Sequence, residues 1–419
     1  MKLSIVIMVF ITGSILSGDK FDQLLKLNQN KDYFKLIENY DNSELNDGEK
    51  LYINALVLNL RNRNEESNEL VSVLLDKYKG SFHDSLVMQL YETKMKNSVN
   101  MFNYKDAVIC TETIINNYFG LLDSTEKDDM KNSLVIWQAA KELQEQSVEI
   151  TGDSRIKVSR YMAGLINIPV KCGGVEEDFI FDTGANFSVV NDTYAEKMKL
   201  VKLPGKIQVG SVTGTMITSQ LAYAPLFEIG SMKFKNVLFL VMPDESLSFA
   251  GGLYVIDGII GLPVIKEMKE IHIKEKEIFV PKQKTTTGLG NLLVDGFIPV
   301  IEVVDGKDSL AFTFDTGAKR TLLYSSYYTR NKADIDKNYK MEEIEFGGAG
   351  GTVKVKGFKL DNKLFKVGSS KFKLEDISLL AENIKDHDKS FFGNLGQDYM
   401  GEFGEMILNF EDMYVDFRK

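Results

Sequence analysis

The stretch FDTGANFSVV, residues 181–190, sets a single carboxylate, Asp182, between two apolar runs. A second stretch, FDTGAKRTLL at residues 314–323, repeats this pattern around Asp315. One Asp-Thr-Gly is an ordinary turn sequence, because an Asp side chain readily accepts a hydrogen bond from a backbone N–H nearby. Two copies in the same apolar setting indicate instead that a whole structural unit is duplicated.

The duplication extends well beyond these two motifs. Each copy has a hairpin-like stretch with a glycine-rich tip, IQVGSVTGTMITSQ at 207–220 and IEFGGAGGTVKV at 344–355. Each also has an apolar turn that reaches a glycine, DGIIGLPVI at 257–265 and GNLGQDYM at 393–400. The Asp precedes the glycine of this turn by 79 residues in the first copy and by 81 in the second. The two copies can therefore be followed in parallel.

From about residue 155 the chain alternates short β-branched and aromatic runs with Gly, Asn and Asp, which is typical of strands and turns. The pattern predicts an all-β region of two similar lobes. We place lobe 1 at residues 157–283, a linker at 284–296 and lobe 2 at 297–419. The copies are not identical, because Asn394 stands in the second apolar turn where Ile259 stands in the first.

Duplicated lobes tend to pack about a pseudo-twofold axis, as subunits of a homodimer do, so equivalent residues near the axis face each other. We therefore expect Asp182 and Asp315 to meet. Two adjacent carboxylates cannot both ionise easily, so the pair holds one proton between them. The charged member can deprotonate a water for attack on a carbonyl carbon, while the protonated member donates a hydrogen bond to the developing oxyanion.

The doubled FDTGA motif, with its hairpins and apolar-glycine turns, makes residues 157–419 resemble the bilobal aspartic proteases. The Ala after the Gly is closest to the retropepsin-like type, here doubled within one chain. The resemblance implies an aspartic endopeptidase that acts on a polypeptide substrate, without cofactor or metal. It implies that Asp182 and Asp315 are catalytic and that the turns Ile259-Ile260-Gly261 and Leu395-Gly396 thread behind their loops. The residues that it implies as support for the pair are Thr183, Gly184, Ala185, Thr316, Gly317 and Ala318.

Hairpin flaps over the substrate are a further feature that the resemblance implies. The candidate flap residues are Gly210, Ser211, Val212, Thr213, Gly214, Gly347, Gly348, Ala349, Gly350 and Gly351. Pepsin-like enzymes carry a Tyr on the N-terminal flap, but none occurs between residues 205 and 220. Either lobe can therefore supply the working flap.

The two alanines of the motifs bear on the pH dependence. Pepsin-like enzymes usually have Ser or Thr at this position, whose hydroxyl can hydrogen-bond the ionised carboxylate and favour the charged form. Ala185 and Ala318 offer no hydroxyl. We therefore expect the pair to keep its shared proton to higher pH, with a mildly acidic to near-neutral optimum.

A different pattern precedes the β region. Between about residues 20 and 148, apolar residues recur at helical spacing. Similar segment endings at Tyr40, Tyr78 and Tyr118 recur at intervals of 38 and 40 residues. Repeats of this length, each of two amphipathic helices, predict a helical-repeat solenoid over 19–150 that loosely resembles tetratricopeptide repeats. We expect this segment to have its own core, to include Trp137 in it, and to be separable from the β region.

The first residues have the pattern of a signal peptide, with one Lys, a short apolar run and then small residues. We assign it to residues 1–18 and expect an extracytoplasmic location, in the periplasm, at the cell surface or secreted. No later apolar stretch approaches the length of a membrane span, so no span is expected after cleavage. The net charge of −10, with no basic stripe, argues against nucleic acid as a partner.

The other reactive residue types offer few alternatives. The two Cys fall in regions of different pattern, and the three His lie far apart with no neighbours at metal-ligand spacing. We therefore predict no zinc site and no Ser-His-Asp triad. The competing hypothesis is a non-catalytic peptide-binding or scaffold protein, in which the helical repeats grip a protein partner. The presence of both Asp182 and Asp315 favours the enzyme.

Overall fold

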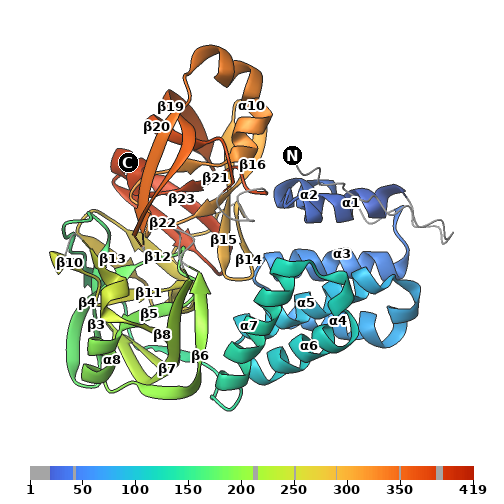
Figure 1. Cartoon of the computed structure of the whole chain (residues 1–419), viewed down its shortest axis with the longest axis horizontal. Helices are drawn as coiled ribbons and strands as arrows, with labels where there is room; N and C mark the ends of the chain where they lie inside the picture. Colours follow the sequence, from blue (N-terminus) through green and yellow to red (C-terminus); the bar gives the residue numbers. More distant parts are fainter. Residues whose placement is uncertain are drawn as a thin grey trace.

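The computed structural model describes residues 19–40, 44–210, 216–249, 252–288, 290–348, 351–383 and 390–419. The predicted signal peptide, residues 1–18, lies outside this range. Figure 1 shows an N-terminal group of helices in blue and cyan beside a larger β-rich region.

The N-terminal region is mainly helical, as the apolar spacing predicts. Its helices and helical turns are α1 (Asp19–Gln29), α2 (Tyr33–Asn39), α3 (Asp47–Leu60), α4 (Asn64–Val73), η2 (Leu74–Tyr78), η3 (Lys79–Ser81), α5 (Asp84–Asn100), α6 (Tyr104–Asn117), η4 (Phe119–Leu121) and α7 (Ser124–Ala140). From α3 to α7, each helix packs against the next. The repeated tyrosines Tyr40, Tyr78 and Tyr118 lie at helix ends, which explains their similar spacing.

The first copy of the duplication forms a sheet with strand order β1-β8-β5-β11-β4-β3-β7-β6, and an added β7–β8 pairing partly closes it. We call this the first sheet. Its strands are β1 (Ser147–Ile150), β3 (Asn167–Cys172), β4 (Val175–Phe181), β5 (Ser188–Asn191), β6 (Val201–Gly210), β7 (Met216–Ile229), β8 (Met232–Met242) and β11 (Gly258–Ile260). Around it lie α8 (Asp192–Lys197), η5 (Asp244–Leu247), the small pair β9 (Ser248–Phe249) and β10 (Tyr254–Val255), α9 (Leu262–Ile265) and η7 (Lys266–Met268).

The second copy forms a sheet with strand order β14-β15-β16-β21-β17-β20-β19-β18, likewise with an added pairing, β15–β19. We call this the second sheet. Its strands are β14 (Leu292–Asp295), β15 (Ile298–Asp305), β16 (Asp308–Phe314), β17 (Leu322–Leu323), β18 (Glu342–Gly348), β19 (Gly351–Val367), β20 (Ser370–Leu380) and β21 (Gly393–Leu395). The helical segments of this copy are α10 (Ser325–Asn338) and η9 (Gln397–Glu402).

The two sheets share one arrangement around the Asp-Thr-Gly loops. In the first sheet β11 lies between β4, to which it is parallel, and β5, to which it is antiparallel. In the second sheet β21 lies in the same way between β16 and β17. The duplication seen in the sequence is therefore also a duplication of strand order.

A third sheet joins the copies. It has the order β2-β13-β12-β22-β23, with β2 (Ser154–Lys157), β12 (Glu270–Ile273) and β13 (Glu277–Val280) before the predicted linker and β22 (Glu405–Asn409) and β23 (Tyr414–Arg418) after it. The antiparallel pairing of β12 with β22 makes the connection. We call this the joining sheet.

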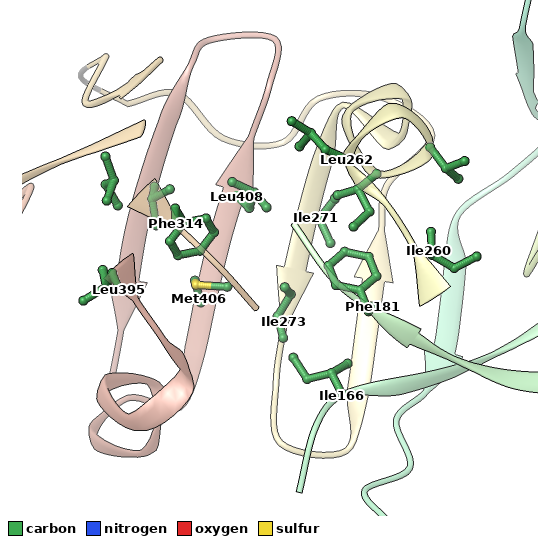
Figure 2. Packing of buried hydrophobic residues seen from close by; sticks show 14 of the residues in the cluster. Ile166, Phe181, Ile260, Leu262, Ile271, Ile273, Phe314, Leu395, Met406 and Leu408 are labelled. Carbon is green, nitrogen blue, oxygen red and sulfur yellow. The ribbon is translucent and has the colours of Figure 1, made fainter. Parts of the chain in front are cut away.

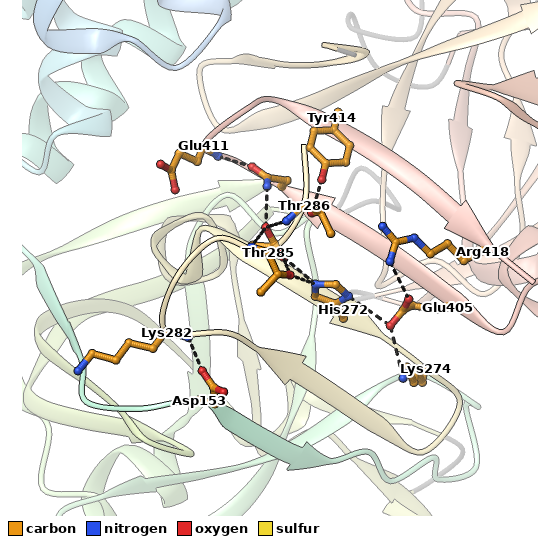
Figure 3. A network of polar contacts seen from close by, with 12 residues as sticks. Asp153, His272, Lys274, Lys282, Thr285, Thr286, Glu405, Glu411, Tyr414 and Arg418 are labelled. Atoms are coloured by element: carbon orange, nitrogen blue, oxygen red, sulfur yellow. Dashed lines mark hydrogen bonds and ion pairs between the residues drawn. The ribbon is translucent and has the colours of Figure 1, made fainter. Parts of the chain in front are cut away.

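A polar cluster supports the joining sheet (Figure 3). The ring of His272 lies between two carboxylates, with its Nε2 2.7 Å from Glu270 Oε1 and its Nδ1 3.2 Å from Glu405 Oε1. Thr285 and Thr286, both from the predicted linker, donate their backbone N–H groups to Glu270. Burial alone raises the pKa of Glu270, but hydrogen bonds from the side chains of Thr285 and His272 and from Thr286 outweigh burial and lower the pKa. The start of the linker is thus held against the joining sheet.

The structure corrects two predicted boundaries. Residues 292–295, placed in the linker, form β14, because Leu292 to Asp295 pair with β15 as an edge strand of the second sheet. Residues 147–150, placed in the helical segment, form β1, because they pair with β8 of the first sheet. Both segments have only four residues, which is too short for sequence periodicity to reveal them.

The main hydrophobic core runs through both copies (Figure 2). Phe181 and Phe314, the residues just before the two Asp, are both buried in it. In Figure 2, Ile260 and Ile271 lie near Phe181, and Leu395 lies near Phe314. Each Asp therefore emerges from a strand end that is fixed by packing.

One small apolar cluster, Ile114, Leu122 and Met130, belongs to the helices alone, but two larger clusters combine helical residues with residues of the sheets, which differs from the expected separate core. Residues of α1 to α5 share an apolar cluster with Leu293, Val300 and Ala311 of the second sheet. Residues of α5 to α7 share another with Val189 and Ile207 of the first sheet. The physical reason is that the amphipathic helices bury their apolar faces against the outer surfaces of both sheets.

Polar contacts at the end of α5 tie the helices to both copies. Asp295 accepts hydrogen bonds from Lys96 Nζ at 2.9 Å, from Lys31 Nζ at 3.0 Å and from Tyr33 Oη at 2.7 Å.

Asn100 donates its side-chain amide to the carbonyl of Gly296 at 2.9 Å. The backbone carbonyl of the same Asn100 accepts a hydrogen bond from the buried Lys266 ammonium, which belongs to the first copy. Burial lowers the pKa of Lys266 to about 8.

Trp137 lies in the apolar contact between α7 and the first sheet, as expected of a core residue. It stacks on Tyr104 with ring centroids 5.9 Å apart and contacts Phe187 at 6.2 Å. Phe187 follows the first Asp-Thr-Gly-Ala loop and meets Phe297 of the second copy at 5.7 Å. The helical region thus supports the chain that leaves the first loop.

Candidate active site

The two Asp-Thr-Gly loops begin where β4 and β16 end, and their backbones are fixed by the neighbouring parallel strands. The N–H of Asp182 donates to the carbonyl of Ile260, and the N–H of Asp315 donates to that of Leu395, both at 3.0 Å. The glycines that follow β11 and β21 also make equivalent hydrogen bonds. Gly261 N–H donates to Ser188 Oγ and Gly396 N–H donates to Thr321 Oγ1, both at 3.1 Å. The predicted turns therefore do lie behind the loops.

Two buried threonines connect the loops. Thr183 Oγ1 accepts the backbone N–H of Thr316 at 3.0 Å and donates to the carbonyl of Phe314 at 2.9 Å. Thr316 Oγ1 accepts the N–H of Thr183 at 3.0 Å and donates to the carbonyl of Phe181 at 2.8 Å. Each loop thus makes the same two bonds to the other, and the four bonds hold the two strand ends side by side.

The carboxyl groups lie against the glycine of the opposite loop. A Cβ added to Gly317 would lie 2.3 Å from Cγ of Asp182, and one added to Gly184 would lie 2.6 Å from Cγ of Asp315. Each carboxyl also accepts the N–H of its own loop's glycine at 2.8 Å. Only glycine fits at these two positions, and the close approach brings Asp182 and Asp315 together.

The proximity changes the proton affinity of the pair. Burial raises the pKa of Asp182 well above its usual value, and the charge of Asp315 and a hydrogen bond to it raise it further. Hydrogen bonds from the N–H groups of Gly184 and Ala185 oppose this rise only in part. The arrangement therefore favours a single proton on the pair.

The alanines after the glycines act through their backbones. The carbonyl of Ala185 accepts the N–H of Leu262 at 2.9 Å, and that of Ala318 accepts the N–H of Gln397 at 2.8 Å. Neither methyl side chain can hydrogen-bond a carboxylate. The predicted supporting residues are thus gathered in the two loops, with the threonines and glycines making the contacts between them.

One side chain at the site was missed as a partner of the carboxyl pair. Asn394 donates its side-chain amide to Oδ2 of Asp315 at 3.0 Å. The premise that no donor replaces the missing hydroxyls is therefore wrong for Asp315. The sequence did show that a polar residue, Asn394, stands in the second copy where the apolar Ile259 stands in the first. Its contact with Asp315, however, depends on the parallel register of β16 and β21.

The four candidate flap residues that the structure describes lie at strand ends of two hairpins. Gly210 ends β6, Gly347 and Gly348 end β18, and Gly351 begins β19. Six candidates lie outside the described residues: Ser211, Val212, Thr213, Gly214, Ala349 and Gly350. Near the first tip, Asn132 of α7 donates to the carbonyl of Gln208 at 2.8 Å and accepts its N–H at 3.3 Å. The helical region thus holds one strand of the first hairpin.

The described part of the chain offers neither a metal site nor a membrane-spanning helix. No group of three or more His, Cys, Asp or Glu side chains there is arranged to hold a metal ion. Among the helices of the described ranges, none combines the length and apolar character that crossing a bilayer requires.

Comparison with known proteins agrees with this geometry for one part of the chain. No curated protein matches the sequence. Residues 168–264 match the family model described as aspartyl protease. The match begins in β3 and ends in α9, so it includes the first Asp-Thr-Gly loop and the β11 turn behind it. The helices precede the matched segment, and the match supports an aspartyl protease domain in this chain.

Proposed function

We propose that this chain is an aspartic endopeptidase, which hydrolyses peptide bonds with a water activated by Asp182 and Asp315. The observation that carries the proposal is the mutual packing of each carboxyl against the other loop's glycine, together with the raised pKa of Asp182. The family match over 168–264 supports the same reaction class.

In the proposed reaction the pair holds one proton, and a water lies between the carboxyls. The carboxylate takes a proton from the water as its oxygen bonds to the peptide carbonyl carbon, and the protonated carboxyl gives its proton to the carbonyl oxygen. In the second step the C–N bond breaks. The carboxyl that took a proton from the water gives this proton to the leaving nitrogen, and the other carboxyl recovers a proton from a hydroxyl of the intermediate. The pair ends as it began, with one proton.

The proposal extends to the architecture. The matching strand orders of the two sheets support a bilobal, retropepsin-like domain, with the joining sheet between the lobes. The consecutive packing of α3 to α7 supports a tetratricopeptide-like helical region. The pattern of residues 1–18 supports export to an extracytoplasmic compartment.

The competing hypothesis is a scaffold whose helices grip a partner. The helices bury much of their apolar surface against the two sheets, which favours a supporting role over partner binding. A protein partner on their outer face remains compatible with the enzyme. We therefore retain catalysis as the function and treat the helices as a wall of the enzyme.

The test of the proposed class is cleavage of an unfolded protein substrate by the whole chain, with the new termini identified by mass spectrometry. We expect internal cleavage between pH 4 and 7 that is unaffected by chelators or by reagents for Ser and Cys nucleophiles. The raised pKa of Asp182 is the reason for expecting activity toward neutral pH. Cleavage that a chelator or a serine reagent abolishes would contradict the proposed class.

A further inference from the structure

The symmetry of the two loops breaks at one pair of positions. On the first copy β4 and β11 place Ile180 opposite Ile259, and on the second copy the same register places Thr313 opposite Asn394. An apolar pair in one half is therefore a polar pair in the other. This difference lies directly beneath one of the two carboxyls.

The polar pair forms a directed chain of hydrogen bonds. Thr313 Oγ1 donates to Asn394 Oδ1 at 2.6 Å, and Asn394 Nδ2 donates to Asp315 Oδ2 at 3.0 Å. The other acceptor near the Thr313 hydroxyl, the carbonyl of Gly393, is more distant at 3.4 Å. In this orientation of the amide, its oxygen accepts from Thr313 and its N–H₂ group faces Asp315.

We propose that Asn394 is a positioning residue that decides which acid carries the shared proton, keeping Asp315 as the carboxylate and leaving the proton on Asp182. An N–H donor stabilises a carboxylate acceptor more than a neutral carboxyl, since bonds to charged groups are the stronger ones. The first copy has only Ile259 at the equivalent place, so Asp182 receives no such donor. The inference rests on the proposed function and deepens it.

The roles in the reaction follow from this placement. Asp315 takes the proton of the attacking water, while Asp182 gives its proton to the carbonyl oxygen of the substrate. When the C–N bond breaks, Asp315 gives the proton to the leaving nitrogen, and Asp182 recovers one from the intermediate. Water is consumed and no other reactant is needed.

Other ionisable groups also act on the pair. Asp182 faces Asp315 across the two loops, and the phenol of Tyr399 is buried near Asp315. Arg160 donates to Gln397, whose amide in turn donates to the carbonyl of Thr316. Lys319 and Arg320 follow the second loop directly in the chain, and Asp398 accepts hydrogen bonds from Thr321. All of them are unchanged in variants of Asn394, so a comparison among such variants isolates the amide.

The test compares four forms of the full chain: wild type, Asn394→Ile, Ile259→Asn and the double exchange. Asn394→Ile gives the second copy the residue of the first, so the acidic limb of the pH profile of kcat/KM should move up by about one to two pH units. The double exchange should bring that limb back down, because it gives the amide to the other acid. Thr313→Val should shift the limb in the same direction as Asn394→Ile, and Thr313→Ser should not.

A second measurement does not need activity. With ¹³C at the Asp carboxyls, the NMR signals lost in Asp182→Asn and Asp315→Asn identify the two acids. At mid-range pH we expect the ¹³C chemical shift of Asp315 to be typical of a carboxylate and that of Asp182 to be typical of a protonated carboxyl. In Asn394→Ile the two chemical shifts should become more alike. If the shifts follow this pattern while no substrate is cleaved, the inference stands and the proposed function fails. If the enzyme cleaves but neither the shifts nor the acidic limb respond to Asn394→Ile, the inference is wrong and the function stands.

Discussion

Thr183 and Thr316 each accept a hydrogen bond from the other's backbone N–H, both at 3.0 Å. Each hydroxyl also donates to a carbonyl of the opposite strand, so one side chain satisfies two backbone groups across the interface between the copies. Both threonines are almost fully buried. The position of the two carboxyls depends on these contacts.

Replacing either threonine by Val should therefore lower the free energy of unfolding by about 3 kcal/mol, because a buried N–H and a buried carbonyl lose their partners. Thr183→Ser and Thr316→Ser keep the hydroxyl and are the matched controls. Urea unfolding of the four variants measures the difference. Val variants as stable as the Ser variants would show that the cross-bonds do not hold the loops.

The glycine contacts give a separate prediction. A Cβ at residue 317 would lie 2.3 Å from Cγ of Asp182, so Gly317→Ala must displace that carboxyl. We expect kcat to fall by about 100-fold or more, since small misplacements of reacting groups have effects of this size. Gly152→Ala is the control, because a Cβ there has no atom within 4 Å. Equal kcat values for the two variants would contradict the close packing of the pair.

The attachment of the helices depends on Asp295. Burial alone would raise the pKa of this carboxyl, but Lys96 and Lys31 outweigh burial and hold the pKa well below its usual range. Because the folded-state pKa is depressed, this group stabilises the fold above about pH 4 and less so as the pH falls.

Asp295→Asn should destabilise the protein by about 3 kcal/mol at neutral pH, since it leaves two lysines at a protein interface without their partner. The control is Asp308→Asn, which removes a carboxylate that is 51% exposed in its ion pair with Arg330. Denaturant unfolding at pH 7 and pH 3 measures both variants. A loss for Asp295→Asn that is no larger than the control's would mean that Asp295 does not hold the helices in place.

The sequence predicted the parts of the site that are local in the chain. The motifs place Asp, Thr and Gly in one tight loop, and the duplication predicts that the two loops meet. The role of Asn394 could not be predicted, because it lies 79 residues after Asp315 and reaches it only through the register of β16 and β21. The contacts of Lys31 and Lys96 with Asp295 depend on how the helices pack, for which an amphipathic pattern gives no partner.

The raised pKa of Asp182 predicts a pH dependence of stability. A buried acid whose folded-state pKa is raised contributes stability that is fully present below its unfolded pKa, about 4, and is lost as the pH rises through the folded pKa. Asp182→Asn cannot ionise, so it should be more stable than the wild type at pH 7 and should lose this advantage toward pH 4. Melting temperatures of both proteins from pH 4 to 8 measure this. Parallel curves would contradict the raised pKa.

We propose that Asp182 and Asp315 act as one catalytic pair. The most direct measurement is the rate of peptide cleavage by the wild type, Asp182→Asn, Asp315→Asn and the control Asp308→Asn, with folding of each checked by circular dichroism. Asp182→Asn and Asp315→Asn each remove one of the two carboxyl groups that share the proton. Each substitution should therefore lower kcat by several orders of magnitude in a folded protein. The control should cleave like the wild type. Cleavage at a wild-type rate by either Asp182→Asn or Asp315→Asn would contradict the account.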